Sequence, residues 1–218
     1  AAPGVVVAVV VDQPSLASEA LREVFSGLAA QDYPNIQILV LLTGSDAAEF
    51  ELVREIAQVQ GSEPSTREPR IYHIGANPGF GLAANMVMRL VEGNSGFFLL
   101  MHDDVVLAPD AIRLLVEEMY RSNAGMVGPK FVEWDETRRL QAVGFDCDWF
   151  GELDSAVEPH ELDQEQHDAV RDVFVLSSSC LLVRADLFRE LGGFEPSIEF
   201  FGEDLDLCWR AHLSGARV

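Results

Sequence analysis

A histidine and two adjacent carboxylates, His102-Asp103-Asp104, directly follow an apolar run that is typical of a buried strand. In open α/β sheets, ligands collect beyond the carboxyl ends of the strands. Mg²⁺ and Mn²⁺ prefer oxygen ligands and accept an imidazole nitrogen, so the triplet could hold a divalent cation. A solvated loop before the helix that begins near Pro109, with His102 packed and both acids facing water, explains the same residues equally well.

A second stretch, Asn77-Pro78-Gly79-Phe80-Gly81-Leu82-Ala83-Ala84-Asn85, lies between a predicted strand and a predicted helix. Backbone N–H groups at such a helix start can bind a phosphate. Gly79, Gly81 and Ala84 also match the dinucleotide-binding fingerprint, with acids about 20 residues further on. That fingerprint follows its strand almost at once, whereas residues 75–78 intervene here. Glycines that serve a tight turn and close helix packing explain the stretch at least as well.

The third stretch is a predicted helix start, Gly202-Glu203-Asp204, which follows Phe200-Phe201. A carboxylate at a helix N-terminus beside aromatic side chains suits a general base that faces a polar substrate. Ordinary capping explains the same acids, because carboxylates complement the helix dipole at that end. Asp206 and Arg210, four residues apart, can pair on one helix face, and we interpret that pair as structural.

The elements that must position these residues alternate between strand and helix. Apolar, β-branched runs without alternation are typical of strands that are buried on both faces. Predicted strands cover residues 5–11, 36–42, 70–74, 96–101 and 126–131, and predicted helices cover residues 16–28, 47–60, 81–92 and 109–123. The order predicts an α/β fold with a mostly parallel central sheet and helices on both faces.

Residues 133–172 break this pattern, because their periodicity is weak and they hold 13 acids against three arginines. We interpret them as an excursion from the sheet. The regular pattern then resumes with a strand over residues 173–183, a short helix over 185–191 and a last helix over 202–214.

Composition restricts the partners and the compartment. The formal net charge is −21, and Lys130 is the only lysine. A chain this acidic is repelled by nucleic acids and by anionic lipid, so neither is an expected partner. Three scattered cysteines are too few for a disulfide framework and favour a reducing compartment. The apolar run Val5–Val11 is seven residues long, whereas a membrane span needs about 20. We expect a cytoplasmic protein.

Together these stretches resemble the family 2 glycosyltransferases, which have the GT-A fold of nucleotide-diphospho-sugar transferases. The resemblance is closest to the rhamnosyltransferase- and galactofuranosyltransferase-like branch, and it spans essentially the whole chain. The stretches that carry it, in the family's order, are GLAAQDYPNIQILVLLTGSD, NPGFGLAANM, FFLLMHDDVVLAPDAI, MVGPK, LQAVG and SSSCLLVRADLFRELGGFEPSIEFFGEDLDLCWRAHLSGARV. Their order and spacing make the resemblance more specific than any single motif.

The resemblance implies one GT-A domain over residues 1–218, with a nucleotide-sugar-binding half at 1–131 and an acceptor-side half at 132–218. It also implies a longer parent protein, in which segments beyond this chain could attach to the cytoplasmic face of a membrane. The implied reaction is an inverting, metal-assisted transfer of a hexose or pentose from a nucleotide-diphosphate sugar. The acceptor would be a hydroxyl on a saccharide, a lipid-linked molecule or another cell-envelope component.

The resemblance also implies roles for individual residues. Asp104 matches the last acid of the family's metal-binding motif and would hold Mn²⁺ or Mg²⁺ together with His102. Asp204 matches the catalytic base, and Glu203 stands beside it. The residues expected to bind the nucleotide sugar are Asp12, Asn77, Gly79, Asn85 and Asp103.

Three features depart from the family pattern. His102 stands where the family usually has an acid or asparagine. Leu42-Thr43-Gly44-Ser45 replaces an acidic motif that holds the nucleobase, and Asp12 could substitute from a shifted position. A histidine sometimes used as a third metal ligand would lie beyond Val218. A glycosyltransferase-like binding or scaffold module without catalysis is therefore an alternative. A dinucleotide-dependent oxidoreductase is another, although it leaves the last forty residues unexplained.

Overall fold

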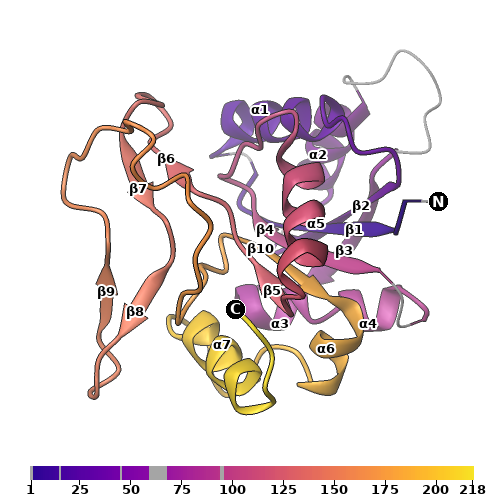
Figure 1. Cartoon of the computed structure of the whole chain (residues 1–218). Coiled ribbons are helices and arrows are strands. Elements are labelled where there is room, and N and C mark those ends of the chain that lie inside the picture. The colour runs from indigo at the N-terminus through magenta and orange to yellow at the C-terminus, as the bar shows by residue number, and fades with distance from the viewer. Residues whose placement is uncertain (1, 15, 45, 59–67, 94–95) are drawn as a thin grey trace.

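The computed structural model describes residues 2–14, 16–44, 46–58, 68–93 and 96–218, and its centre is a six-stranded sheet (Figure 1). The strand order is β3-β2-β1-β4-β10-β5. The pairs β1–β2, β2–β3 and β1–β4 are parallel, whereas β10 runs antiparallel to both of its neighbours, β4 and β5. The strands are β1 (Val5–Asp12), β2 (Ile36–Thr43), β3 (Arg70–Gly75), β4 (Phe97–His102), β5 (Met126–Val127) and β10 (Cys180–Arg184). The predicted α/β fold with a mostly parallel sheet is confirmed.

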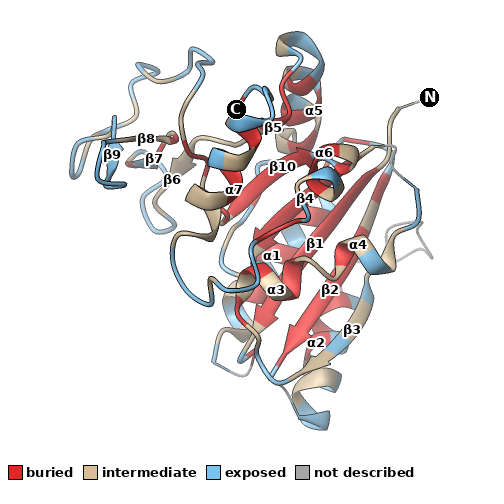
Figure 2. Ribbon diagram, turned by 90° about the horizontal axis from the view of Figure 1, so that it is seen from below, coloured by how far each residue is buried: buried red, intermediate tan, exposed pale blue. Residues whose placement is uncertain are grey.

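Alternate side chains of β1 enter two separate hydrophobic cores, which explains its uninterrupted apolar sequence. Val5, Val7 and Val9 pack into one core, and Val6 and Ala8 pack into the other. Figure 2 shows the buried central strands between the helices that cover them. A strand that is buried on both faces gains nothing from polar alternation, so its sequence is continuously hydrophobic.

The helices divide between the two faces of the sheet. The first core is closed by α1 (Ser18–Ala29), α2 (Ala47–Gln58) and α5 (Ala111–Ser122). The second is closed by α3 (Phe80–Ala84), α4 (Val87–Leu90), α6 (Ala185–Glu190) and α7 (Glu203–Leu213). In the described parts of the chain, we find no helix with the length and apolar character that crossing a membrane requires.

Three predicted elements are shorter or more broken than the sequence indicates. The predicted helix over 81–92 is interrupted after Ala84, where the Asn85 side chain bonds to the backbone of Phe194. The predicted strand over 126–131 is divided at Gly128-Pro129, where proline has no N–H for a ladder. The predicted strand over 173–183 is regular only in β10, because the residues before it bond to other elements.

The acidic excursion is confirmed as a separate part of the fold. With Phe131–Val132 just before it, it forms two small antiparallel sheets outside the central one, β6–β7 and β8–β9. These strands are β6 (Phe131–Val132), β7 (Leu140–Ala142), β8 (Phe145–Cys147) and β9 (Leu153–Ser155). Lys130 joins the excursion to the end of β5 through Asp163, at 2.7 Å, and Asp168, at 2.5 Å.

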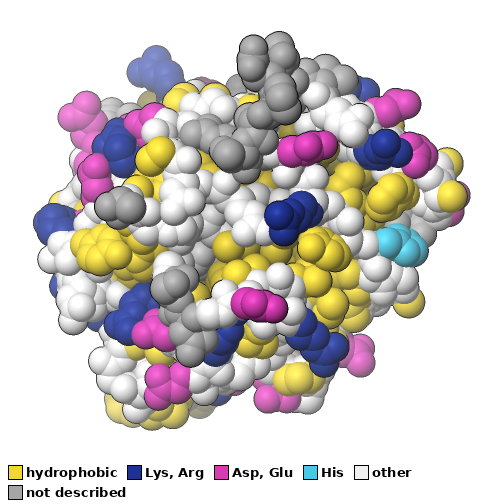
Figure 3. All heavy atoms as spheres, turned by 90° about the vertical axis from the view of Figure 1, so that its right-hand side faces the viewer, with side chains coloured by type: hydrophobic (Ala, Val, Ile, Leu, Met, Phe, Trp, Pro, Cys, Tyr) yellow, Lys and Arg dark blue, Asp and Glu magenta, His cyan; other side chains and the backbone are white. Residues whose placement is uncertain are grey.

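On the face to the right of Figure 1, acidic and basic side chains are mixed (Figure 3).

Candidate active site

The carboxyl ends of β1, β2 and β4 meet at one edge of the sheet and bring two predicted donor-binding residues together. The parallel register places Asp12 opposite Thr43, and Val10 opposite His102. The backbone N–H of Asp12 donates to Asp103 Oδ2 at 3.1 Å. Thr43 Oγ1 donates to Asp12 Oδ1 at 3.0 Å. This edge is therefore a connected set of polar groups rather than a row of independent side chains.

The two adjacent acids after β4 have different surroundings. Burial raises the pKa of Asp103 to about 6, and the neighbouring charges of Asp104 and Asp12 act in the same direction. The hydrogen bond from the Asp12 backbone opposes them. Asp104 is exposed. Asp103 thus ties the strand ends together, whereas Asp104 is the carboxylate that a ligand can reach.

His102 links this edge to the start of α7. Its backbone N–H donates to the Ser179 carbonyl at 3.1 Å, and its ring lies 4.1 Å from the Phe80 ring, centroid to centroid. Its Nε2 is buried and has no hydrogen-bond partner among the described residues. Burial lowers the pKa of His102, while the charges of Asp104, Glu203 and Asp204 raise it. The candidate metal-binding and base residues therefore share one electrostatic environment.

The N-terminal turn of α7 holds the two predicted catalytic acids. Asp204 Oδ1 accepts the Leu205 backbone N–H at 2.8 Å. Burial raises the pKa of Asp204, and the charge of Glu203 raises it further. Glu203 Oε1 accepts a hydrogen bond from Ser178 Oγ at 3.0 Å. A half-buried carboxylate with a raised pKa, at a helix end that favours negative charge, has the properties of a general base.

Sequence reasoning missed Ser178. It lies among three consecutive serines within the predicted strand over 173–183, and no local signal distinguishes it from its neighbours. Its contact with Glu203 joins residues 25 positions apart, so only the fold could show it.

The glycines of the second stretch are explained by close packing. Gly79 has φ +88°, and a Cβ there would lie 2.5 Å from the Glu199 carbonyl oxygen. A Cβ on Gly81 would lie 2.9 Å from the Phe194 Cβ. Both glycines let α3 approach the segment that leads into α7. The packing interpretation therefore accounts for the residues on which the dinucleotide alternative rests.

The two asparagines of this stretch face different neighbours. Asn77 accepts the Gly79 N–H at 2.8 Å, and it lies on the Asp12 side, where a Cβ on Gly44 would approach both residues. The Asn85 side chain instead exchanges two hydrogen bonds of 2.8 Å with the backbone of Phe194. Asn85 thus fixes the turn before α7, and its role in donor binding stays a prediction.

Leu42 stands where the family pattern has an acidic motif that holds the nucleobase, but it has no part in the site. It is fully buried in the core that α1 and α2 cover. The β2 side chain that meets the strand edge is Thr43, through its bond to Asp12. Ser45 lies outside the described residues.

The candidate metal ligands suit a cation that is shared with a substrate. Among the described residues, no three histidine, cysteine or acidic side chains cluster closely enough to form a metal cage. Mg²⁺ and similar cations are commonly held by one or two carboxylates, with substrate phosphates supplying further oxygens. Exposed Asp104 meets that requirement, and the buried Nε2 of His102 has no hydrogen-bond partner among the described residues.

A prediction about stability tests the packing role of Gly79. We expect Gly79→Ala to lower the free energy of unfolding by about 2–4 kcal/mol, through backbone strain and overlap with Glu199. Gly93→Ala is the matched control, because Gly93 has φ +84° but no neighbour within 4 Å of its added Cβ. Urea unfolding of both variants measures the difference. Equal losses would contradict the packing role.

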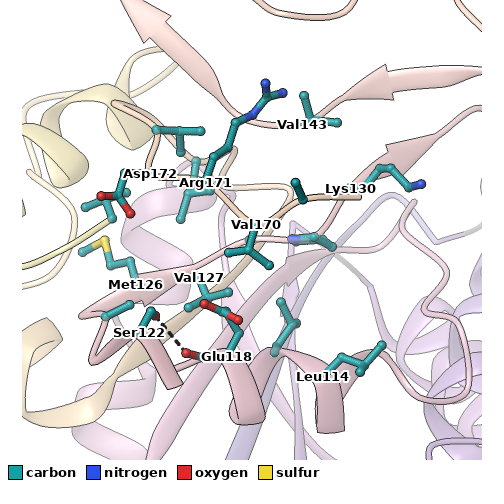
Figure 4. Close-up of a pocket in the computed structure, with 18 of the residues that line it drawn as sticks. Leu114, Glu118, Ser122, Met126, Val127, Lys130, Val143, Val170, Arg171 and Asp172 are labelled. Atoms are coloured by element: carbon teal, nitrogen blue, oxygen red, sulfur yellow. Dashed lines mark hydrogen bonds between the residues drawn. The ribbon is translucent and has the colours of Figure 1, made fainter. Parts of the chain in front are cut away.

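A separate cavity of about 520 Å³ lies between α5, β5 and residues 167–173 (Figure 4). Its wall is largely apolar, with Leu114 and Glu118 on one side and Val170 on another. None of the predicted site residues lines it. This cavity is therefore distinct from the edge where the carboxylates gather.

The structure is thus an α/β sheet with acids at the carboxyl end of β4 and at the start of α7. The family model described as "Glycosyltransferase like family 2" matches residues 3–218. The chain belongs to this family. The predicted GT-A fold is confirmed by this match and by the solved structures that are similar to it.

Two curated relatives are similar in sequence. O-antigen biosynthesis protein RfbC of Myxococcus xanthus is 25% identical over 215 residues, which is 95% of this chain and 16% of that protein. Pre-mycofactocin glycosyltransferase of Mycobacterium tuberculosis is 26% identical over 142 residues, which is 63% of this chain and 28% of that protein. The chain thus spans less than a third of the length of either relative.

Two solved structures share the fold. Mannosyltransferase PcManGT from Pyrobaculum calidifontis, in complex with GDP-Man and Mn²⁺, has a TM-score of 0.69 at 16% identity. The match covers 100% of this chain and 54% of that one. S. aureus TarS has a TM-score of 0.65 at 15% identity, covering 96% of this chain and 33% of that one.

Proposed function

We propose that this domain transfers a sugar from a nucleotide-diphosphate donor to an acceptor hydroxyl with inversion at the anomeric carbon. The proposal rests on one observation: Ser179, bonded to the His102 N–H at the end of β4, and Ser178, bonded to Glu203, join that strand end to the acids that begin α7, in a chain that matches the family from residue 3 to residue 218.

The proposed chemistry is a single displacement. The acceptor oxygen forms a bond to the anomeric carbon as the bond from that carbon to the diphosphate oxygen breaks. The diphosphate leaves with the bonding electrons, and Asp204 takes the proton of the acceptor hydroxyl. Attack opposite the leaving group inverts the anomeric centre without a covalent enzyme intermediate. The position of Asp204 in the first turn of α7 supports this role.

A divalent cation, Mn²⁺ or Mg²⁺, is the proposed cofactor. Asp104 would hold it together with His102, and when bound it neutralises the charge that develops on the departing diphosphate. Support comes from the exposed Asp104 carboxylate and from the fold likeness to a mannosyltransferase whose complex contains Mn²⁺. With a net charge of −21, the protein would repel an anionic donor in the absence of such a cation.

The donor is proposed to bind at the edge formed by Asp12, Asn77, Gly79 and Asp103, within the predicted half 1–131. The acceptor side would be formed from residues 132–218, although β10 of that half belongs to the central sheet. A saccharide or cell-envelope acceptor fits the name of the O-antigen relative. The rhamnosyltransferase- and galactofuranosyltransferase-like branch, and the choice between hexose and pentose, stay predictions.

Calorimetric titration tests the proposal. We expect one or more nucleotide-diphosphate sugars from a panel to bind, and to bind at least about tenfold more tightly with Mn²⁺ present, because a cation held by Asp104 would neutralise charge on the diphosphate. NAD is the control ligand. A scaffold that has lost catalysis predicts no binding of any donor. That alternative is motivated by Leu42, which is buried and apolar, and by His102.

A further inference from the structure

The segment Ser177–Ser179, which precedes β10, is fixed between the two halves of the candidate site. The Ser179 carbonyl accepts the His102 backbone N–H at 3.1 Å, which fastens the segment to the end of β4. Ser177 Oγ accepts the Ser179 N–H at 3.2 Å and donates to Ser179 Oγ at 3.0 Å. These bonds leave Ser178 as the serine that is directed at α7.

Ser178 interacts with both acids of α7 through different groups. Its side-chain Oγ donates to Glu203 Oε1 at 3.0 Å. Its backbone N–H favours the ionised form of Asp204, which opposes the rise in the pKa of that carboxyl caused by burial. The residue is only 4% exposed, so little solvent can replace its hydroxyl as a donor.

If only one of two adjacent carboxylates is to act as a base, the other needs a hydrogen-bond donor that holds it in place. The charge of Glu203 raises the pKa of Asp204, so the two groups are electrostatically coupled. A half-buried carboxylate without a donor turns toward other partners, because an unsatisfied buried charge is costly. The Ser178 hydroxyl supplies a donor to Glu203 and restricts its orientation.

We propose that Ser178 is a positioning residue, whose hydroxyl holds Glu203 in one orientation and so leaves Asp204 to receive the acceptor proton. This inference rests on the proposed transferase function and adds a residue to that site. It requires no contact between Ser178 and the substrate, because the serine acts through Glu203.

Ser178→Ala tests the role of the hydroxyl and leaves the backbone N–H in place. We expect kcat to fall by about 10- to 100-fold, the effect of one lost hydrogen bond to a charged group. The KM for the donor should stay within about threefold, because the proposed donor edge lies across the site at β1 and β4. Ser178→Thr keeps a hydroxyl and should recover most of kcat. Ser122→Ala, which removes a hydroxyl bonded to a carbonyl of α5, is the matched control.

A double-mutant cycle separates positioning from general damage. In a Glu203→Ala background, Ser178→Ala should cause no further loss, because the partner of the hydroxyl is already absent. If the two losses multiply, or if Ser178→Ala keeps the kcat of the unaltered protein, the inference is overturned. Should Ser178→Ala fail to fold, Glu203→Ala removes the same bond from the other side. Full kcat in that variant would equally overturn the inference.

The proposed function fails in a different way. Absence of transfer by the unaltered protein, with every donor that binds, would contradict the transferase assignment and with it any catalytic role for Ser178. Transfer by the unaltered protein together with an inert Ser178→Ala substitution would contradict only the positioning role.

Discussion

Replacing Asp204 with asparagine is expected to reduce sugar transfer by about 10²- to 10⁴-fold, the usual contribution of a general base. Asparagine keeps the oxygen that accepts the Leu205 N–H, so the first turn of α7 should persist. What the variant loses is the capacity to take the acceptor proton. Release of nucleoside diphosphate in the presence of acceptor measures the effect.

The same substitution should leave the free energy of unfolding within about 1 kcal/mol of its original value. A carboxyl with a raised folded-state pKa binds protons more tightly in the folded state, so its ionisation weakens folding as the pH rises through that range. Asparagine does not ionise, so the variant avoids this loss of stability. The gain offsets the lost interaction of the Asp204 charge with the helix dipole, which is worth about 0.3–1 kcal/mol.

Asp206→Asn is the matched control on the same helix. Asp206 pairs with Arg210, whose Nε lies 2.9 Å from Asp206 Oδ2, as the sequence spacing predicted. The control should lose about 1 kcal/mol of stability and keep transfer within about threefold. Retained turnover in Asp204→Asn, or equal loss of turnover in the two variants, would contradict the assignment of Asp204 as the base.

The rate of transfer should depend on pH through the ionisation of Asp204. The base must be ionised, so the rate falls as the pH falls through its pKa. Because burial and Glu203 raise that pKa, the acid limb of the rate profile should lie above the range of an ordinary aspartate. The residual activity of Asp204→Asn should lack this limb.

Much of the fold could be predicted from the sequence, because the central strands are buried on both faces. Val5–Val11 is continuously apolar and Ile36–Leu42 is apolar except for Gln37, and burial on both faces is the environment that suits such runs in a chain with this alternation of elements. Shorter elements were harder to predict. The two-residue strand β5 depends on pairing with β10, which lies more than 50 residues further along the chain.

The candidate site, too, could be predicted from the sequence only in part. His102-Asp103-Asp104 and Glu203-Asp204 were visible because acids at a strand end and at a helix start have recognisable local patterns. The different burial of Asp103 and Asp104 was not visible, because it depends on the approach of the Asp12 backbone. The contacts of Ser178 and Phe80 were hidden for the same reason, since each joins distant parts of the chain.

Replacing Asp104 with asparagine is expected to reduce transfer by about 100-fold or more, because charge neutralisation at the leaving group is worth several kcal/mol. Asp104 is the exposed acid of the pair after β4, so its loss should disturb the core little. Asp103 accepts the Asp12 N–H and would couple any loss of activity to loss of structure. Asp104 is therefore the cleaner test of the proposed metal site.

Two measurements make this prediction specific to the cation. In calorimetry, the variant should lose the Mn²⁺-dependent gain in donor affinity but keep the weaker affinity seen without Mn²⁺. In the transfer assay, a chelator should inactivate the original protein and have little further effect on Asp104→Asn. Asp110→Asn, a nearby acid that pairs with Arg113 at the start of α5, is the control and should respond to Mn²⁺ as the original protein does. If Asp104→Asn kept both full transfer and its response to Mn²⁺, Asp104 would not be the metal ligand, and the cation would have to be held elsewhere at the strand edge.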